Sequence, residues 1–198
     1  QSYKGSNYNL LGIAPPSIFI RDIAKYSKNL GISIGSQNID QFFFGARTGE
    51  ISSSMVQDAG GSFSITGHSE RRILFNESDD DIGAKLDCAT KGSLIPILCV
   101  GESWEQKNQH QTQSVLEKQV THALQVCSKL HTLIIAYEPV WAIGSGLTPQ
   151  SQEINSIHTM IKDVVQSRFS NIDLQAVIYG GSVNIENSKS IFKEKEID

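Results

Sequence analysis

Six short, nearly continuous apolar runs limit what this chain can fold into. They cover residues 10–14, 32–34, 63–66, 94–100, 133–137 and 176–179. Each run is too short for a helix of ordinary length. Most also lack the alternation of apolar and polar residues that is typical of a strand with one solvent-exposed face. Such runs are typical of strands that are buried on both faces of a parallel sheet.

The segments between the runs have helical features. Apolar residues recur with helical spacing over residues 18–26, 115–124 and 154–165, and Ser78 followed by three aspartates predicts another helix start. Strands that alternate with helices predict βαβ units and a parallel sheet. A complete (β/α)₈ barrel takes about 250 residues, so six units within 198 residues predict one domain over residues 1–198 that holds about six of the eight units. An open doubly wound sheet remains the structural alternative.

Composition excludes several classes of protein. The net charge of −4 gives no basic surface for nucleic acid or lipid. The three cysteines are an odd number without a C-x-x-C pair, which indicates free thiols in a reducing compartment and argues against a zinc site. No apolar stretch approaches the roughly 18 residues that span a bilayer. We therefore expect a cytoplasmic protein that binds neither nucleic acid nor a membrane.

A histidine follows the third run, within residues 67–72 (GHSERR). The active site of a barrel lies at the carboxyl ends of its strands, where this histidine falls. Just before a helical turn, His68 would face the positive end of the helix, which disfavours the imidazolium. It could then donate a hydrogen bond to a substrate carbonyl, although a histidine satisfied within a polar loop is the alternative.

A glutamate follows the fifth run. Burying a carboxylate is costly unless it is paired or used, so Glu138 is a candidate general base, with a salt-bridged glutamate as the alternative. The segment after it has a stiff Pro-Val-Trp entry and a Gly-Ser-Gly exit, as expected of a lid. The sixth run ends in Gly180-Gly181-Ser182, where backbone N–H groups could approach an anion. These glycines fit neither the ATP nor the dinucleotide pattern.

Three consecutive phenylalanines, Phe42 to Phe44, occupy a probable loop after the second run. Aromatic side chains in a loop are either buried against a partner or form a local cover. A subunit interface and a local core cover remain open from these residues alone.

Taken together, these motifs resemble the triosephosphate isomerase family. The shared strings are residues 14–16 (APP), 37–38 (QN), 48–52 (TGEIS), 67–72 (GHSERR), 136–144 (AYEPVWAIG) and 179–182 (YGGS). The order and approximate spacing match over essentially the whole chain, and the two longest strings are highly specific. That family is a standard example of a glutamate base, a neutral histidine and a closing loop.

The resemblance implies a cofactor-free and metal-free isomerase of glycolysis and gluconeogenesis that interconverts two triose phosphates. It implies that Glu138 is the base and that His68 polarises the carbonyl. Further roles are implied for three groups of residues. They are the substrate-binding Gly144, Gly180, Gly181 and Ser182, the supporting Ser69, Glu70, Glu102, Trp141 (with Tyr137) and Tyr179, and, at the interface of a homodimer, Gln37, Thr48, Glu50 and Arg71.

Three departures from the family pattern accompany the resemblance. The family's first strand ends in Asn-x-Lys and its eighth in Gly-Gly. No strand with the first motif opens this chain, and the chain stops before the strand that would carry the second. We therefore expect a chain that lacks the first and last strands and is inactive by itself, with a non-catalytic anion-binding or subunit role as the alternative function. Pro149 near the lid exit has no N–H, so any hinge hydrogen bond there must differ.

Overall fold

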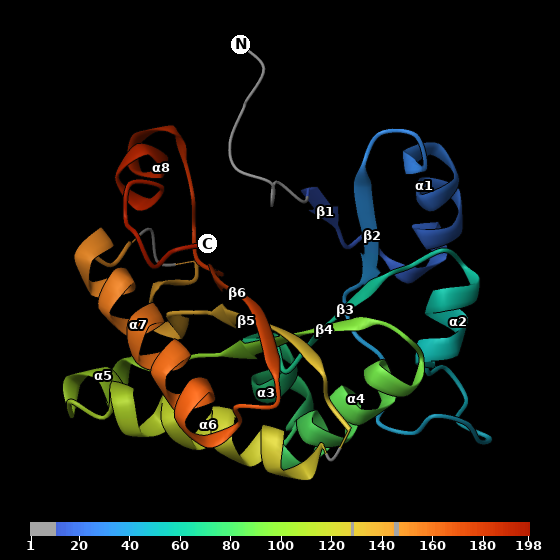
Figure 1. Cartoon of the computed structure of the whole chain (residues 1–198), viewed down its shortest axis with the longest axis horizontal. Helices are drawn as coiled ribbons and strands as arrows, with labels where there is room; N and C mark the ends of the chain where they lie inside the picture. Colours follow the sequence, from blue (N-terminus) through green and yellow to red (C-terminus); the bar gives the residue numbers. More distant parts are fainter. Residues whose placement is uncertain (1–10, 128, 145–146) are drawn as a thin grey trace.

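A single curved sheet of six parallel strands organises the molecule (Figure 1). The computed structural model describes residues 11–198, apart from residues 128 and 145–146. The strands are β1 (Leu11–Ile13), β2 (Ile32–Ser36), β3 (Phe63–Thr66), β4 (Ile95–Val100), β5 (Thr132–Tyr137) and β6 (Asp173–Tyr179). Each strand pairs in parallel with the one that precedes it in the chain, in the order β1-β2-β3-β4-β5-β6. This order never reverses, as that of a doubly wound sheet would, so the expected partial (β/α)₈ barrel is confirmed.

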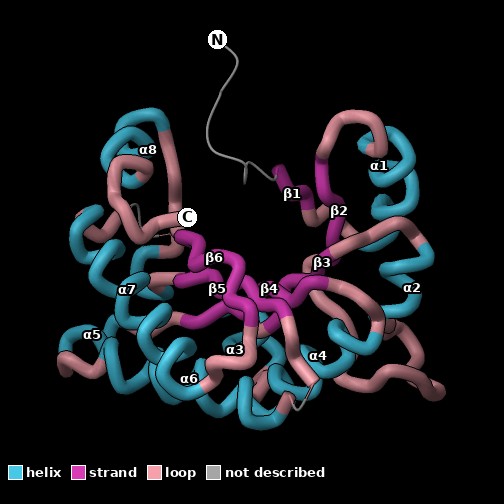
Figure 2. The backbone as a smooth tube through the Cα atoms, in the orientation of Figure 1, coloured by secondary structure: helices cyan, strands magenta, loops and turns pink. Residues whose placement is uncertain are grey.

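Helices line the outer side of the curved sheet (Figure 2). They are α1 (Ile20–Ser27), α2 (Ser53–Asp58), α3 (Ser69–Phe75), α4 (Asp79–Lys91), α5 (Trp104–Asn108), α6 (Thr112–Val126), α7 (Ser151–Arg168) and α8 (Ile185–Ile191), with 3₁₀ helices η1 (Ser17–Phe19) and η2 (Val140–Ala142). The predicted start of α4 is confirmed by a capping box. Ser78 Oγ accepts the N–H of Asp81, and the Asp81 carboxylate accepts the N–H of Ser78 at 2.9 Å.

Two apolar clusters fill the space between the sheet and these helices. The larger joins β4, β5 and β6 to α4, α6 and α7, through residues such as Leu98, Leu116 and Ile154. The smaller joins β2 to α1, α2 and α4, around Ile20, Ile34 and Val56. The apolar stripes predicted for α6 and α7 therefore face the core, because their periodicity matches the helical repeat.

Two expectations at the amino-terminal side of the sheet were wrong. Strand β1 is exposed throughout, with Leu11 60% accessible, although its apolar run predicted burial on both faces. Within the described residues β1 pairs with β2 alone, so it lacks a neighbour on its other side. In the stripe expected over residues 18–26, Ile20 is buried but Ile18 lies in η1 and, like Tyr26, is exposed. Residue 10 of the first run lies outside the described residues.

The strand register brings the chemical residues to one edge. Val100 of β4 is level with Tyr137 of β5, which is level with Tyr179 of β6. Because the strands are parallel, the residues that follow them meet at the same carboxyl edge. This edge carries the candidate site.

Candidate active site

His68 and Glu138 face each other at this edge. His68 is the N-cap of α3, directly after β3, and Glu138 follows β5. His68 Nε2 lies 3.4 Å from Glu138 Oε1, and Glu138 is 4% exposed. Two residues 70 positions apart in the chain thus form one pair, as the strand-end reasoning predicted.

The hydrogen bonds of His68 define its tautomer. Its Nδ1 accepts the backbone N–H of Glu70 at 3.2 Å, at the start of α3. Nδ1 must be unprotonated to accept this bond, so the ring proton of the neutral imidazole lies on Nε2, which faces Glu138. The Glu70 side chain itself is largely exposed, with its Oε2 3.8 Å from Nδ1.

Glu138 is fixed by backbone groups on both sides. The N–H of Ser69 donates to Glu138 Oε2 at 3.0 Å, and the N–H of Glu138 donates to the carbonyl of Val100 at 2.8 Å. The carboxylate is therefore satisfied although it is buried, which offsets the cost of desolvation. A buried carboxylate beside an imidazole N–H can move a proton to and from a carbon whose neighbouring carbonyl the imidazole polarises.

Glycines leave the space that Glu138 occupies. A Cβ on Gly101 would lie 1.8 Å from the Glu138 carbonyl oxygen, and a Cβ on Gly180 would lie 2.8 Å from its Cγ. Packing against Glu138 therefore favours a glycine at position 180, in addition to the anion contact that the sequence led us to expect. Similarly, a Cβ on Gly181 would lie 2.1 Å from the hydroxyl oxygen of Tyr179.

Cys99 lies beside Glu138 but is not a second nucleophile. It is 2% exposed. Burial raises the pKa of the Cys99 thiol well above its usual value, and the negative charge of Glu138 raises it further. A thiol that stays protonated is a poor nucleophile, so Cys99 contributes packing at this point.

The start of the expected lid is anchored on a buried acid. Glu102 is fully buried, and its Oε1 accepts Trp141 Nε1–H at 2.8 Å and the Tyr137 hydroxyl at 3.2 Å. Burial raises the pKa of Glu102, against the opposing effect of these two donors. The geometry thus joins Glu102, Trp141 and Tyr137, which the resemblance grouped as supporting residues, at the start of the expected lid. Gly144 lies further along the lid at φ +70°, whereas the Ser145-Gly146 exit lies outside the described residues.

Lys107 adds a contact to this anchor that the sequence did not reveal. Its Nζ lies 4.3 Å from the centre of the Trp141 ring and also pairs with Glu153 of α7. Trp104 packs against the same ring, with 5.9 Å between the ring centres. A lysine and a glutamate on helices carry no signal of such a contact, because both are typical of solvated helix faces.

The Gly180-Gly181-Ser182 turn leads into α8 as expected. Asn184 caps this helix by accepting the N–H groups of Glu186 and Asn187. Gly180 and Ser182 are exposed at the carboxyl edge of the sheet. The predicted anion contact of this turn stays a prediction.

The residues assigned to an interface come from the loop after β2 and from α3. Thr48 and Glu50 are exposed, and Gln37 Nε2 donates to the carbonyl of Ala14 at 3.1 Å. Within the described residues Arg71 does not pair with Glu50, and the assignment of both residues to a dimer interface stays a prediction. The partner of Arg71 is Glu77, at 2.7 Å.

Glu77 also binds a buried lysine that the sequence did not reveal. Lys85 of α4 is 4% exposed, pairs with Glu77 and donates to Asn38 Oδ1 at 2.7 Å. Burial lowers the pKa of Lys85, while Glu77 raises it. Asn38 follows β2, so this network ties the loops after β2 and β3 together.

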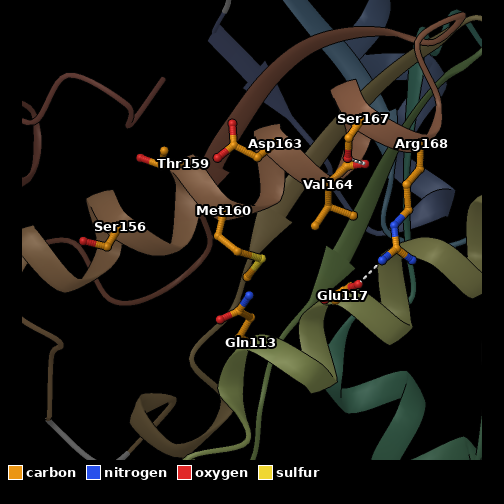
Figure 3. A pocket seen from close by; sticks show the side chains of 9 residues that line it. All are labelled: Gln113, Glu117, Ser156, Thr159, Met160, Asp163, Val164, Ser167 and Arg168. Carbon is orange, nitrogen blue, oxygen red and sulfur yellow. Dashed lines mark hydrogen bonds and ion pairs between the residues drawn. The ribbon is translucent and has the colours of Figure 1, made fainter.

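A shallow groove of about 490 Å³ lies elsewhere, between α6 and α7 (Figure 3). Arg168 reaches across it to Glu117. Neither His68 nor Glu138 lines this groove, so we place the site at the strand ends, where the titratable groups converge. Among the described residues, no group of His, Cys, Asp and Glu side chains is arranged to hold a metal ion. No described helix has both the length and the apolar character needed to cross a bilayer.

Comparison with known proteins gives a consistent result. The family model of triosephosphate isomerase matches residues 2–198. A triosephosphate isomerase of Baumannia cicadellinicola subsp. Homalodisca coagulata is 37% identical over 191 residues, which are 95% of this chain and 75% of that protein. The enzyme of Dictyoglomus turgidum is 39% identical over 199 residues, which are 98% of this chain and 80% of that protein.

Proposed function

The chain belongs to the triosephosphate isomerase family, and we propose that it uses Glu138 as the base and His68 as the electrophile of the reaction. The enzymes of this family interconvert D-glyceraldehyde 3-phosphate and dihydroxyacetone phosphate, which is the function of this chain. The observation that carries the proposed roles is the 3.4 Å approach of His68 Nε2 to Glu138 Oε1 at the strand ends.

The proposed reaction has two steps and passes through an enediolate. In the first step the Glu138 carboxylate removes a proton from the carbon next to the substrate carbonyl, the electron pair of that C–H bond forms the C=C bond, and the carbonyl electron pair moves onto its oxygen, where the Nε2–H of His68 stabilises it. His68 then gives its Nε2 proton to this oxygen and takes up the proton of the neighbouring hydroxyl group, so that its own proton is restored. In the second step Glu138 returns its proton to the former carbonyl carbon, and the neighbouring oxygen becomes the new carbonyl, so that no atom is gained or lost overall. Both oxygens of Glu138 face protein groups in the structure, so we infer that the carboxylate leaves the Ser69 N–H when substrate enters.

We further propose that the backbone at Gly144 and Ser182, with Gly180 and Gly181, contacts the substrate phosphate. The exposure of Gly180 and Ser182, and the position of Gly180 beside Glu138, support this placement. Small residues allow backbone N–H groups to approach an anion closely.

Conversion of glyceraldehyde 3-phosphate by the full chain and by its E138Q variant tests the base. The neutral amide cannot accept the proton, so we expect kcat to fall by about 10²- to 10⁴-fold. Glu105→Gln, at an exposed glutamate of α5, is the matched control and should retain wild-type kcat. An E138Q variant with full kcat would remove Glu138 from this role, and a wild-type chain without turnover would favour the non-catalytic alternative.

A homodimer in the cytoplasm is the proposed setting of this activity. Phe44 is 87% exposed and Phe42 49% exposed in the loop after β2, which supports a partner surface. All three cysteines are free and buried, which supports a reducing compartment. In sedimentation equilibrium we expect twice the chain mass for the wild type and one chain mass for F44D. Tyr26→Asp, at an equally exposed aromatic residue of α1, should behave as the wild type.

A further inference from the structure

Gln119 of α6 forms a reciprocal pair of hydrogen bonds with Gly101. The N–H of Gly101 donates to Gln119 Oε1 at 2.9 Å, and Gln119 Nε2 donates to the carbonyl of Gly101 at 3.1 Å. Gln119 belongs to an outer helix, and Gly101 is the first residue after β4 (Figure 1). A half-buried side chain thus reaches from the outer layer to the carboxyl edge of the sheet and binds both polar groups of one residue.

Gly101 in turn touches both functional parts of the site. Its Cα is so close to Glu138 that a Cβ would lie 1.8 Å from the Glu138 carbonyl oxygen. It also directly precedes Glu102, the residue that anchors Trp141 at the start of the lid. A shift of Gly101 would therefore displace the backbone of the base and the carboxylate of the hinge together.

The neutral amide of Gln119 supplies both the donor and the acceptor that this contact needs. A glutamate could accept from the N–H of Gly101 but could not donate to its carbonyl, and an apolar side chain could do neither. Gly101 lies beyond the end of β4, so its groups are not part of the Val100–Tyr137 ladder. Loss of both hydrogen bonds would leave the partly buried N–H and carbonyl groups of Gly101 without their partners on Gln119, which is unfavourable.

We propose that Gln119 is a positioning residue that fixes Gly101 and thereby sets the geometry of Glu138 and of the Glu102–Trp141 anchor. The proposal rests on the roles assigned above to Glu138 and to the lid. Gln119 does not touch substrate and acts through Gly101 alone.

The first test compares Q119M with Q125M in the full chain. Methionine keeps the length of the side chain but removes both hydrogen bonds, and Gln125 is an exposed residue of the same helix. We expect Q119M to lower kcat by about tenfold or more, because small displacements of a catalytic group are costly, and to change KM by less than about twofold. Q125M should match the wild type. Equal kcat values for the two variants would overturn the proposal.

The second test separates positioning from stability by the pH profile of Q119E. The ionised carboxylate lacks the donor to the carbonyl of Gly101, and protonation at lower pH restores an O–H donor. The ratio of Q119E to wild-type kcat should therefore rise as pH falls. A ratio that is constant over pH would contradict positioning through this bond.

The third test does not depend on turnover. The chain has two tryptophans, so Trp104→Phe leaves Trp141 as the single emitter beside Glu102. Adding Q119M to this background should shift the emission of Trp141, and adding Q125M should not. If the wild-type chain does not turn over triose phosphate, the proposed function fails. The Trp141 emission of these variants then tests by itself whether Gln119 positions the Glu102–Trp141 anchor. An unchanged emission would then refute this positioning.

Discussion

The backbone N–H of Ser69 donates to Oε2 of Glu138 at 3.0 Å, so the first residue of α3 sets the resting position of the Glu138 carboxylate. His68, the N-cap of the same helix, presents Nε2 to the other carboxylate oxygen. One helix start therefore places both the proposed electrophile and the donor that holds the proposed base. Removal of the Ser69 N–H should act on catalysis without changing either functional side chain.

Replacing Ser69 by proline tests this relationship. Proline has no N–H and suits the first position of a helix, and His68 already has the extended conformation that precedes proline, with φ −50° and ψ 144°. We expect S69P to fold but to lower kcat by about tenfold, because the carboxylate loses its fixed position. Steady-state kinetics beside S69A, which keeps the N–H and should stay within about twofold of the wild type, measure the effect. A kcat of S69P equal to that of S69A would show that this bond does not position Glu138.

The hydrogen bond from Trp141 to Glu102 should control the lid. W141F removes a donor to a buried acid, and bonds of this kind contribute about 1.5–3 kcal/mol when the acid is charged. We expect kcat/KM to fall by about tenfold or more, because the start of the lid loses its anchor. A double-mutant cycle with E102Q provides the check. The two changes should be strongly non-additive, whereas additive losses would mean that the residues act separately.

Alanine should have different effects at Gly180 and at Gly101. At Gly180 the added Cβ meets Cγ of Glu138 at 2.8 Å and the carbonyl oxygen of Tyr137 at 3.3 Å, so G180A should fold with a lowered melting temperature and lose activity through displacement of the Glu138 side chain. At Gly101 the Cβ meets the backbone carbonyl of Glu138 at 1.8 Å, so G101A should fail to reach the native fold. Thermal melts and kinetics of both variants measure these outcomes. Full activity in G180A would show that Glu138 does not depend on the space above Gly180.

His158 of α7 should make stability depend on pH. It is fully buried, and burial lowers its pKa to about 4, while its Nδ1 donates to the carbonyl of Glu196. The folded protein thus binds fewer protons than the unfolded chain between the unfolded pKa of about 6.5 and about 4. Stability is fully present above this window and is lost as pH falls through it, by at most about 3 kcal/mol.

Urea denaturation of the wild type and H158Q measures this effect. The amide can still donate to Glu196, so H158Q should lose less stability than the wild type as pH falls from about 7 to about 4. His131→Gln, at an exposed histidine, should follow the wild type. Equal pH slopes for the wild type and H158Q would rule out His158 as the cause.

Local periodicity was enough to predict much of the fold. The apolar runs located all six strands, and Ser78 located the start of α4, because these features depend on neighbouring residues. The exposure of β1 could not be predicted in this way. It depends on which strands lie beside it, and the composition of residues 11–13 does not carry that information.

In the candidate site, too, features set by neighbouring residues could be predicted, and features set by tertiary structure could not. His68 and Glu138 were found because they follow apolar runs within distinctive strings, whereas Glu102, Trp141 and Tyr137 were assigned through the family resemblance alone. Gln119, Lys85 and Lys107 were missed because each is a polar residue of an amphipathic helix, which is the pattern of a solvated face. Their partners are set by tertiary structure: Lys85 and Asn38 are 47 positions apart. A polar residue flanked by buried helical neighbours, such as Gln119 beside Val120, is the one weak signal that was available.

The unbroken order of the strands has a consequence for how the chain acquires its structure. Each strand pairs with the strand made just before it, and the intervening helix packs beside that pair. During synthesis, every strand from β2 onward therefore meets a partner strand that has already left the ribosome. The pair of His68 and Glu138 can form once residues 132–138 have emerged, and the glycine turn at residues 180–182 joins the same edge later.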